Sequence, residues 1–243
     1  MLERLENLSA LYANPHRFMK LAARLHAPVW SVAVVVLALG LFMVSGVPDD
    51  YQQGATVRIM FVHVPAAWMA LFAYSFIFFA SLVAVVLRHP LGYLAARAAA
   101  PVGAVFTLVA LVTGALWGQP MWGTWWVWDA RLTSVLVLLF IYLGYIALWE
   151  AIDDYGRAAR ATSILAFVGF VNVPIVKFSV DWWNTLHQPA SVSRFARPAL
   201  HADFLYPLLV MGVAFLFLFL AITLTRLQME VLRQRLRVRQ SEI

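Results

Sequence analysis

Six long apolar runs constrain what this chain can fold into more than any other feature of its sequence. They cover residues 29–47, 61–87, 99–116, 132–149, 161–178 and 204–225. Each is close to the roughly 20 apolar residues that a helix needs to cross the hydrocarbon core of a bilayer. A helix also satisfies its own backbone polar groups, which a lipid environment demands. The runs predict an all-α integral membrane protein whose six transmembrane helices form one bundle.

The composition agrees with a membrane protein. Of the 243 residues, 63% are hydrophobic and 12% are charged. A soluble domain is about half apolar and about a quarter charged. The sequence has no cysteine, which excludes disulfides, thiolate catalysis and thiolate metal ligands.

Positive charge is divided unevenly between the loops. If the six runs cross the membrane, 13 of the 18 Lys and Arg residues lie on the side of the two termini. Because cytoplasmic loops carry the excess of Lys and Arg, both termini are predicted to be cytoplasmic. The net charge of +6 therefore indicates membrane orientation rather than nucleic-acid binding.

The whole chain, residues 1–243, is predicted to form a single six-span membrane domain. Residues 1–27 are expected to be a cytoplasmic amphipathic segment lying on the membrane, or equally a solvated tail. Residues 226–243 form a basic cytoplasmic tail. This tail is either solvated or a helix that continues out of the sixth span and is held by anionic lipid or a cytoplasmic partner.

Residues 117–131, between the third and fourth runs, hold half of the ten tryptophans. One interpretation is an aromatic belt, because Trp favours the headgroup level of a membrane. Five indole rings in one loop supply more flat apolar area than an anchor needs, which favours a platform for a broad, planar ligand with charged edges. The orientation above puts this loop on the outer, periplasmic face. The platform residues are Trp117, Trp122, Trp125, Trp126 and Trp128.

Two histidines, His63 and His187, are predicted on the same outer face, and each has a proline two residues later. A helix that starts at this proline would keep the imidazole just above its N-terminus, neutral and ready to ligate a metal. Two such rings beside an aromatic platform suit the axial ligation of haem iron. The alternative for a single histidine is an ordinary interfacial side chain. His201 is the one competing ligand on this face, and the remaining histidines are interpreted as interfacial: His16, His26 and His89.

Haem propionates require cations, and four arginines lie on the predicted outer side. These are Arg58, Arg131, Arg194 and Arg197. Asp129 follows the tryptophans directly and is expected either to orient the loop or to pair with Arg131 at the start of the fourth helix, where an Asp suits the helix dipole. Both interpretations can hold together.

The interiors of the six runs contain no Asp, Glu, Arg or His, and Lys177 lies near the end of one run. Proton- and ion-coupled transporters carry such residues in mid-membrane. The chemistry of this protein is therefore predicted at its outer surface.

Residues 117–134 resemble the tryptophan-rich signature of haem-handling membrane proteins: WGQPMWGTWWVWDARLTS. With its size, its six spans and its two outer histidines, the chain is similar over essentially its whole length to the cytochrome c maturation protein C family, also called haem exporter protein C. A larger relative in the same pathway shares the motif but has many more spans.

This resemblance implies a b-type haem, bound non-covalently at the periplasmic face of a bacterial inner membrane by two axial histidines that map onto His63 and His187. It implies that the haem is delivered to a membrane-anchored chaperone, whose own histidine becomes covalently bonded to it. Further implied partners are the ATPase and permease subunits of an ATP-binding-cassette transporter and a small single-span membrane protein. The family assists this attachment and is not expected to be an enzyme.

Two other classes of function remain open from the sequence. The chain could be a permease subunit, for haem or another small molecule, in an export complex driven by a separate ATPase. A membrane enzyme using His and Asp as an acid–base pair is the third possibility, although the sequence offers it no nucleophile and no metal-ligand spacing.

Overall fold

The structure, a computed structural model, describes residues 15–188, 192 and 197–241. Every regular element in this part of the chain is helical. The elements are α2 (Pro15–Ser45), the short 3₁₀ helix η1 (Ala55–Ile59), α3 (Met60–Val86), α4 (Pro90–Trp122), α5 (Ala130–Ala151), α6 (Tyr155–Phe170), α7 (Asn172–Trp182) and α8 (Ala202–Ser241). Six helical segments among the described residues are long and apolar enough to span a membrane, which confirms the prediction of six helices of membrane-spanning length.

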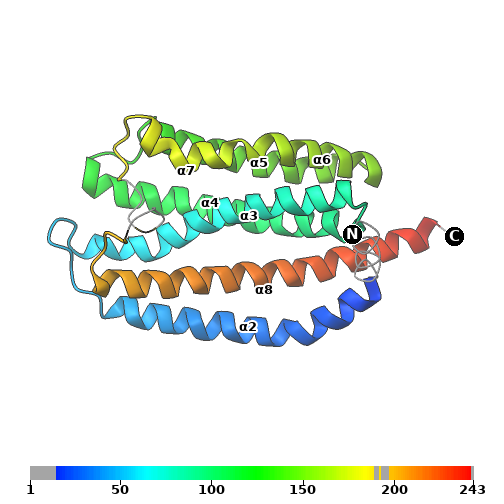
Figure 1. Cartoon of the computed structure of the whole chain (residues 1–243), viewed down its shortest axis with the longest axis horizontal. Helices are drawn as coiled ribbons and strands as arrows, with labels where there is room; N and C mark the ends of the chain where they lie inside the picture. Colours follow the sequence, from blue (N-terminus) through cyan, green and yellow to red (C-terminus); the bar gives the residue numbers. More distant parts are fainter. Residues whose placement is uncertain (1–14, 189–191, 193–196, 242–243) are drawn as a thin grey trace.

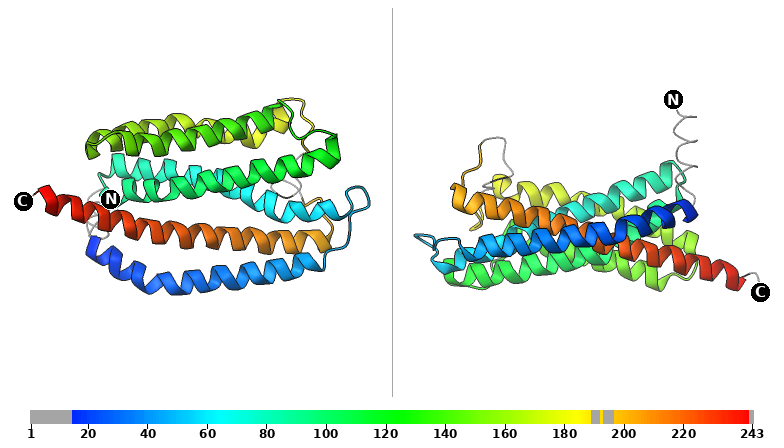
Figure 2. Two further views of the ribbon diagram at one scale, coloured as in Figure 1. Left: turned by 180° about the vertical axis from the view of Figure 1, so that it is seen from behind. Right: turned by 90° about the horizontal axis from the view of Figure 1, so that it is seen from below.

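The helices run lengthwise beside one another in a single bundle (Figure 1). The α3–α4 pair forms its centre, with α5, α6 and α7 on one side and α8 and α2 on the other. The start of α2 and the end of α8 lie together at one end, here called the basic end. The opposite end carries η1, the end of α4 and the start of α8, and is called the tryptophan end (Figures 1 and 2).

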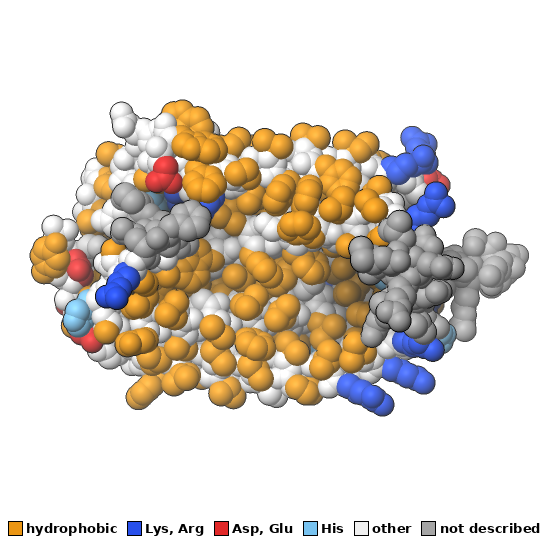
Figure 3. All heavy atoms as spheres, viewed as in Figure 1, with side chains coloured by type: hydrophobic (Ala, Val, Ile, Leu, Met, Phe, Trp, Pro, Cys, Tyr) orange, Lys and Arg blue, Asp and Glu red, His pale blue; other side chains and the backbone are white. Residues whose placement is uncertain are grey.

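The surface of the bundle is that of a membrane protein. A broad band of apolar side chains covers its middle, whereas Lys and Arg side chains gather at the basic end (Figure 3). Large apolar residues such as Phe42, Phe140 and Val168 are exposed on this band. So much continuous apolar surface is stable only against lipid or other apolar partners.

The fifth predicted span, residues 161–178, is a broken helix. Pro174 has no N–H, and its ring collides with the carbonyl of Phe170, four residues earlier. Accordingly α6 ends at Phe170, and α7 begins at Asn172. The buried Asn172 side chain donates to the carbonyl of Ser134 on α5 (2.9 Å), which ties the break to the bundle.

Two tyrosines connect the helices deep in the bundle. The Tyr142 hydroxyl donates to the carbonyl of Ala70 (2.7 Å), and the Tyr74 hydroxyl donates to the carbonyl of Leu165 (2.9 Å). Their rings meet edge to face, with centroids 5.2 Å apart. Buried tyrosines keep a hydroxyl partner because an unpaired one is costly to bury.

The contact of Tyr74 with α6 predicts a sensitive position. A methyl group at Gly169 would collide with the Tyr74 hydroxyl and reach 2.7 Å from Cγ2 of Ile141. We expect Gly169→Ala to lower the stability of the purified protein by about 1–3 kcal/mol, the cost of overpacking. The matched control is Gly144→Ala, whose methyl group would meet Leu165 at an ordinary 3.7 Å. Equal melting temperatures for the two variants in detergent would contradict the prediction.

The outer limits of two helices differ from the sequence prediction. The third span, predicted over 99–116, runs from Pro90 to Trp122, because Pro90 takes the first helical position, where no N–H is needed. Arg97, predicted in a turn, is therefore a nearly buried helical residue. The sixth helix continues to Ser241, as one of the two tail hypotheses expects. Its extension packs on α4, where Val231 contacts Leu94.

Candidate functional site

His63 lies in the first turn of α3, at the tryptophan end. The prediction that Pro65 starts this helix is wrong: η1 leads directly into α3, which begins at Met60 and contains Pro65. The matching proline after His187 lies outside the described residues, and no helix occurs in 183–188. His63 therefore does not lie just before a helix start, so a helix dipole does not explain a neutral ring at this position. The hydrogen bonds of the ring determine its protonated nitrogen instead.

The His63 ring packs against α4. Its Nδ1 lies 3.0 Å from the carbonyl oxygen of Ala110 and 3.2 Å from Oγ1 of Thr113. Because a carbonyl only accepts, Nδ1 carries the proton and Nε2 keeps its lone pair. A methyl group at Gly114 would lie 3.0 Å from Cε1 of this ring, so the glycine provides the space for it.

His187 has the same arrangement in the segment between α7 and α8. Its Nδ1 lies 2.9 Å from the carbonyl oxygen of Gln188, so the proton is again on Nδ1. Its backbone N–H donates to Oγ1 of Thr185 (3.0 Å). Burial lowers the pKa of His187 below its ordinary 6.5, and the nearby Arg131 charge adds to this effect. At neutral pH the ring is therefore neutral, and its Nε2 has no hydrogen-bond partner in the described part of the chain.

The two imidazoles lie close together although 124 positions separate them in the chain. Their ring centroids are 6.3 Å apart, and the ring planes are inclined by 34°. A metal–imidazole bond is about 2 Å long, so two imidazoles on opposite sides of one metal ion have centroids roughly 6 Å apart. The observed spacing is compatible with two ligands of one metal ion, and the hydrogen bonds of the described residues leave Nε2 of both rings available.

Two of the five tryptophans flank this histidine pair. Trp117 meets His63 edge-on (5.8 Å between centroids), and Trp122 lies 6.3 Å from His187. Both belong to the last turns of α4 rather than to a loop. Trp117 is held by a hydrogen bond from its Nε1 to Oε1 of Gln53 (2.9 Å).

The other three tryptophans lie in the loop 123–129, which follows a left-handed Gly123 at the end of α4. Trp126 and Trp128 contact each other at 5.4 Å, and Trp125 and Trp128 are exposed. None of the three makes a ring contact with either histidine among the described residues. The contacts of the five tryptophans thus differ, because two of them flank the histidines and the other three lie in the loop after α4.

Asp129 and Arg131 have separate roles. Oδ1 of Asp129 accepts from the backbone N–H of Leu132 (2.8 Å) and caps α5, whereas its Oδ2 is buried and has no hydrogen-bond partner among the described residues. Arg131 reaches α7 instead, where its Nε donates to Oγ of Ser179 (2.7 Å). The ion pairs of the described residues do not include Asp129–Arg131, so the cap and not a salt bridge starts the fourth helix.

The remaining cations are less closely tied to the histidines. Arg58 pairs with Asp49 (2.8 Å) and donates to the carbonyl of Val47 (2.8 Å), which closes the loop after α2. Arg197 is exposed, and the predicted Arg194 lies outside the described residues. His201 is exposed beside Oδ2 of Asp203 (3.3 Å) and is not brought to the histidine pair.

Comparison with known proteins identifies the family of this chain. The profile of the family described as Heme exporter protein C matches residues 8–242. The chain belongs to this family. Heme exporter protein C of Bradyrhizobium diazoefficiens is 57% identical over 225 residues, which is 93% of this chain and 86% of the relative. Heme exporter protein C of Paracoccus denitrificans is 47% identical, over 93% of this chain and 94% of the relative. A protein of Marchantia polymorpha named "Putative cytochrome c biosynthesis ccmC-like mitochondrial protein" is 47% identical, over 76% and 77% respectively.

The sequence did not indicate several residues that support the site. Thr113 hydrogen-bonds to His63, and Gly114 leaves room for the His63 ring. Ser179 accepts from Arg131, and Gln53 accepts from Trp117. These residue types are common in every helix and loop, so a single sequence gives no signal for them. Only their contacts across helices identify them.

Proposed function

We propose that this protein binds a b-type haem non-covalently at the tryptophan end of its bundle, with His63 and His187 as axial ligands, and delivers it during cytochrome c biogenesis. The histidine pair supports this proposal most directly. Each Nδ1 is bonded to a backbone carbonyl, each Nε2 has no hydrogen-bond partner within the described residues, and the ring centroids are 6.3 Å apart. When bound, haem supplies an iron that takes two imidazoles, and the protein fixes their tautomers and orientation.

The orientation in the membrane follows from charge. Lys and Arg side chains gather at the basic end (Figure 3), and loops rich in these residues stay in the cytoplasm. The basic end, with both termini, is then cytoplasmic, and the histidine pair faces the periplasm of a bacterial inner membrane. Arg131, beside the pair, and Arg58, on the same face, are the cations available to haem propionates.

Delivery requires an open site, and the tryptophan end offers one. Trp125 and Trp128, in the loop that follows α4, expose 58% and 76% of their surface at this end of the bundle. In the proposed function, haem passes here to a membrane-anchored periplasmic chaperone, and subunits of an ATP-binding-cassette transporter and a small single-span protein complete the assembly. The relatives named Heme exporter protein C and the cytochrome c biosynthesis protein of Marchantia support this role.

The absorption spectrum of the purified protein tests the proposal. We expect haem to co-purify or to bind on addition, with the low-spin spectrum of bis-histidine iron and with haem that acid–acetone extracts completely. A protein that takes up no haem, or that holds it with a high-spin spectrum at neutral pH, would refute the ligand assignment.

The tryptophans are expected to affect haem occupancy rather than ligation. Trp122→Ala, Trp125→Ala and Trp128→Ala each remove apolar area that covers the macrocycle, which costs a few kcal/mol at most, at about 25 cal/mol per Å². We expect haem content or transfer to the chaperone to fall, most for Trp122→Ala beside His187, while the remaining haem keeps a bis-histidine spectrum. If these variants bind and transfer haem normally and only membrane insertion suffers, the tryptophans are an interfacial anchor.

A further inference from the structure

Arg131 is held at the tryptophan end by a partner on another helix. It lies in the first turn of α5, and its Nε donates to Oγ of Ser179 on α7 (2.7 Å). Its Nη2 lies 3.4 Å from the carbonyl oxygen of Lys177, a weaker contact on the same helix. Since α7 packs mainly on α5 (Figure 1), the guanidinium joins the start of one helix to the last turns of the other.

Ser179 is placed to accept this bond. It is fully buried, and its hydroxyl donates to the carbonyl of Val176 (2.9 Å). Because a hydroxyl has one proton and two lone pairs, this bond uses the proton and leaves the lone pairs to accept from Arg131. The carbonyl of Ser179 accepts from the backbone N–H of Trp183, which ends α7. Ser179 thus holds the guanidinium at the point where the chain leaves α7 toward His187.

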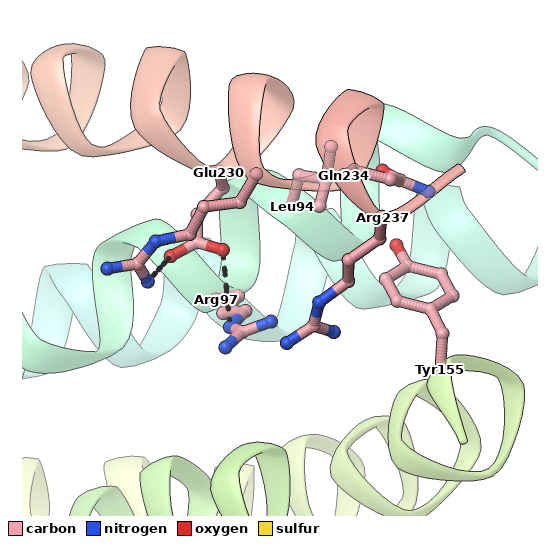
Figure 4. A pocket seen from close by; sticks show the side chains of 7 residues that line it. Leu94, Arg97, Tyr155, Glu230, Gln234 and Arg237 are labelled. Atoms are coloured by element: carbon pink, nitrogen blue, oxygen red, sulfur yellow. Dashed lines mark hydrogen bonds and ion pairs between the residues drawn. The ribbon is translucent and has the colours of Figure 1, made fainter. Parts of the chain in front are cut away.

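The bond to Ser179 does not neutralise the charge of Arg131. At the basic end, Arg97 is also held across helices, but its partner is the carboxylate of Glu230 (Figure 4). A serine hydroxyl carries no charge, and the ion pairs in the described part of the chain do not include Arg131. Burial lowers the pKa of His187 and the charge of Arg131 lowers it further, although Asp129 offsets part of this effect. The positive charge of Arg131 therefore reaches the histidine pair.

We propose that Ser179 is a positioning residue for the histidine pair, because it fixes the Arg131 guanidinium and thereby the positive potential at His187. The hydrogen bonds of Ser179 in the described structure do not reach either histidine, so its effect passes through Arg131. The inference rests on the proposed function, since the potential matters for an iron bound by His187. A fixed cation favours reduced iron, which carries one positive charge less than oxidised iron.

The midpoint potential of the bound haem measures this effect. Ser179→Ala releases the guanidinium, so we expect the bis-histidine spectrum to persist while the ratio of ferrous to ferric protein at a fixed potential falls about threefold. This fall equals a midpoint about 30 mV lower, at about 59 mV per tenfold for one electron. A purely structural role would lower the haem content or the melting temperature and leave the midpoint unchanged, which would overturn the proposal.

The matched control is Ser163→Ala on α6. Ser163 is also a buried serine, and among the described residues its hydroxyl bonds only the carbonyl of Ala159, in its own helix (2.8 Å). Its removal costs the same kind of hydroxyl without touching an arginine, so the midpoint should stay at the wild-type value. A fall in the midpoint as large as that of Ser179→Ala would overturn the proposal.

Substitutions of Arg131 test whether Ser179 acts through it. Arg131→Gln removes the charge and should lower the midpoint more than Ser179→Ala does. Adding Ser179→Ala to Arg131→Gln should then have no further effect, because the group that Ser179 positions is gone. Arg131→Lys keeps a charge but lacks the Nε–H that meets Ser179, and its midpoint should fall between those of wild type and Arg131→Gln. A further fall in the double variant, or a wild-type midpoint for Arg131→Lys, would overturn the proposal.

Haem content separates this inference from the proposed function. Full haem content with equal midpoints in the wild type and Ser179→Ala leaves the proposed function intact and overturns only the role of Ser179. A wild type that takes up no haem refutes the ligand assignment, and this inference with it, before any potential is measured.

Discussion

His63→Ala and His187→Ala are each expected to abolish the bis-histidine spectrum. In the proposed assignment, each substitution removes one of two axial nitrogens, and the remaining imidazole cannot supply both ligands. Loss of a group that merely supports a metal ligand lowers affinity by about 10–100-fold, so loss of the ligand itself should lower haem retention by more. The measurement is haem content per protein, together with the absorption spectrum of whatever haem remains.

The matched control is His201→Ala, which removes an exposed histidine from the same end of the bundle. His201 pairs with Asp203 and makes no ring contact with the histidine pair. Its removal should leave both the spectrum and the haem content unchanged. If His63→Ala and His187→Ala both bind haem with an unaltered spectrum, the ligand assignment is wrong. If His201→Ala alone changes the spectrum, His201 is the competing ligand after all.

Glu230→Ala is expected to destabilise the protein by about 3 kcal/mol, because it leaves a nearly buried guanidinium without its buried partner. The side chain of Glu230 is 4% exposed and bonds both Arg97 and Arg233. The Arg97 side chain is 10% exposed and lies 5.0 Å from the centre of the Trp149 ring. The expected result is a lower melting temperature and earlier proteolysis of the α8 extension, which this pair holds on α4.

Glu150→Ala supplies the control, because Glu150 bonds the same Arg97 while its side chain is 69% exposed. Exposed ion pairs contribute about 0–1 kcal/mol, so this variant should melt close to the wild type. A Glu230→Ala variant that melts no lower than Glu150→Ala would mean that the buried pair contributes nothing net to stability. Glu230→Gln, which keeps hydrogen-bonding capacity, should fall between the two.

Some features follow from local sequence because their cause is local. Apolar runs of membrane length predict helices wherever the chain folds, since lipid demands internal backbone hydrogen bonds. Asp129 was predicted at the start of the fourth helix and caps it, because the capping bond joins residues three apart. Pro174 also indicates the break between α6 and α7, because a proline interrupts a helix, although one continuous span was predicted there.

Other features depended on packing across helices. Pro65 was expected to begin a helix, but η1 leads into α3 before it and α3 continues through it. The helical turns before Pro65 are stabilised because η1 and α3 pack on α4. The sequence identified the tryptophans as a group, yet only the end of α4 brings Trp117 and Trp122 to the histidines. The sequence left open whether the tail after residue 225 is a solvated segment or a helix. In the structure it is helical, and its buried Glu230 pairs with Arg97 and fixes its first turns on α4.

The sequence by itself determined the number of spans, the basic and tryptophan-rich ends, and the residue types available for ligation. These properties depend on composition and on neighbours along the chain. Only the tertiary structure decided that the ring centroids of His63 and His187 lie 6.3 Å apart and that a backbone carbonyl accepts from each Nδ1. The physical reason is that this pairing depends on how α3 packs against α4 and where the chain after α7 returns. Such long-range contacts are set by the complementarity of whole helix surfaces, which no short stretch of sequence contains.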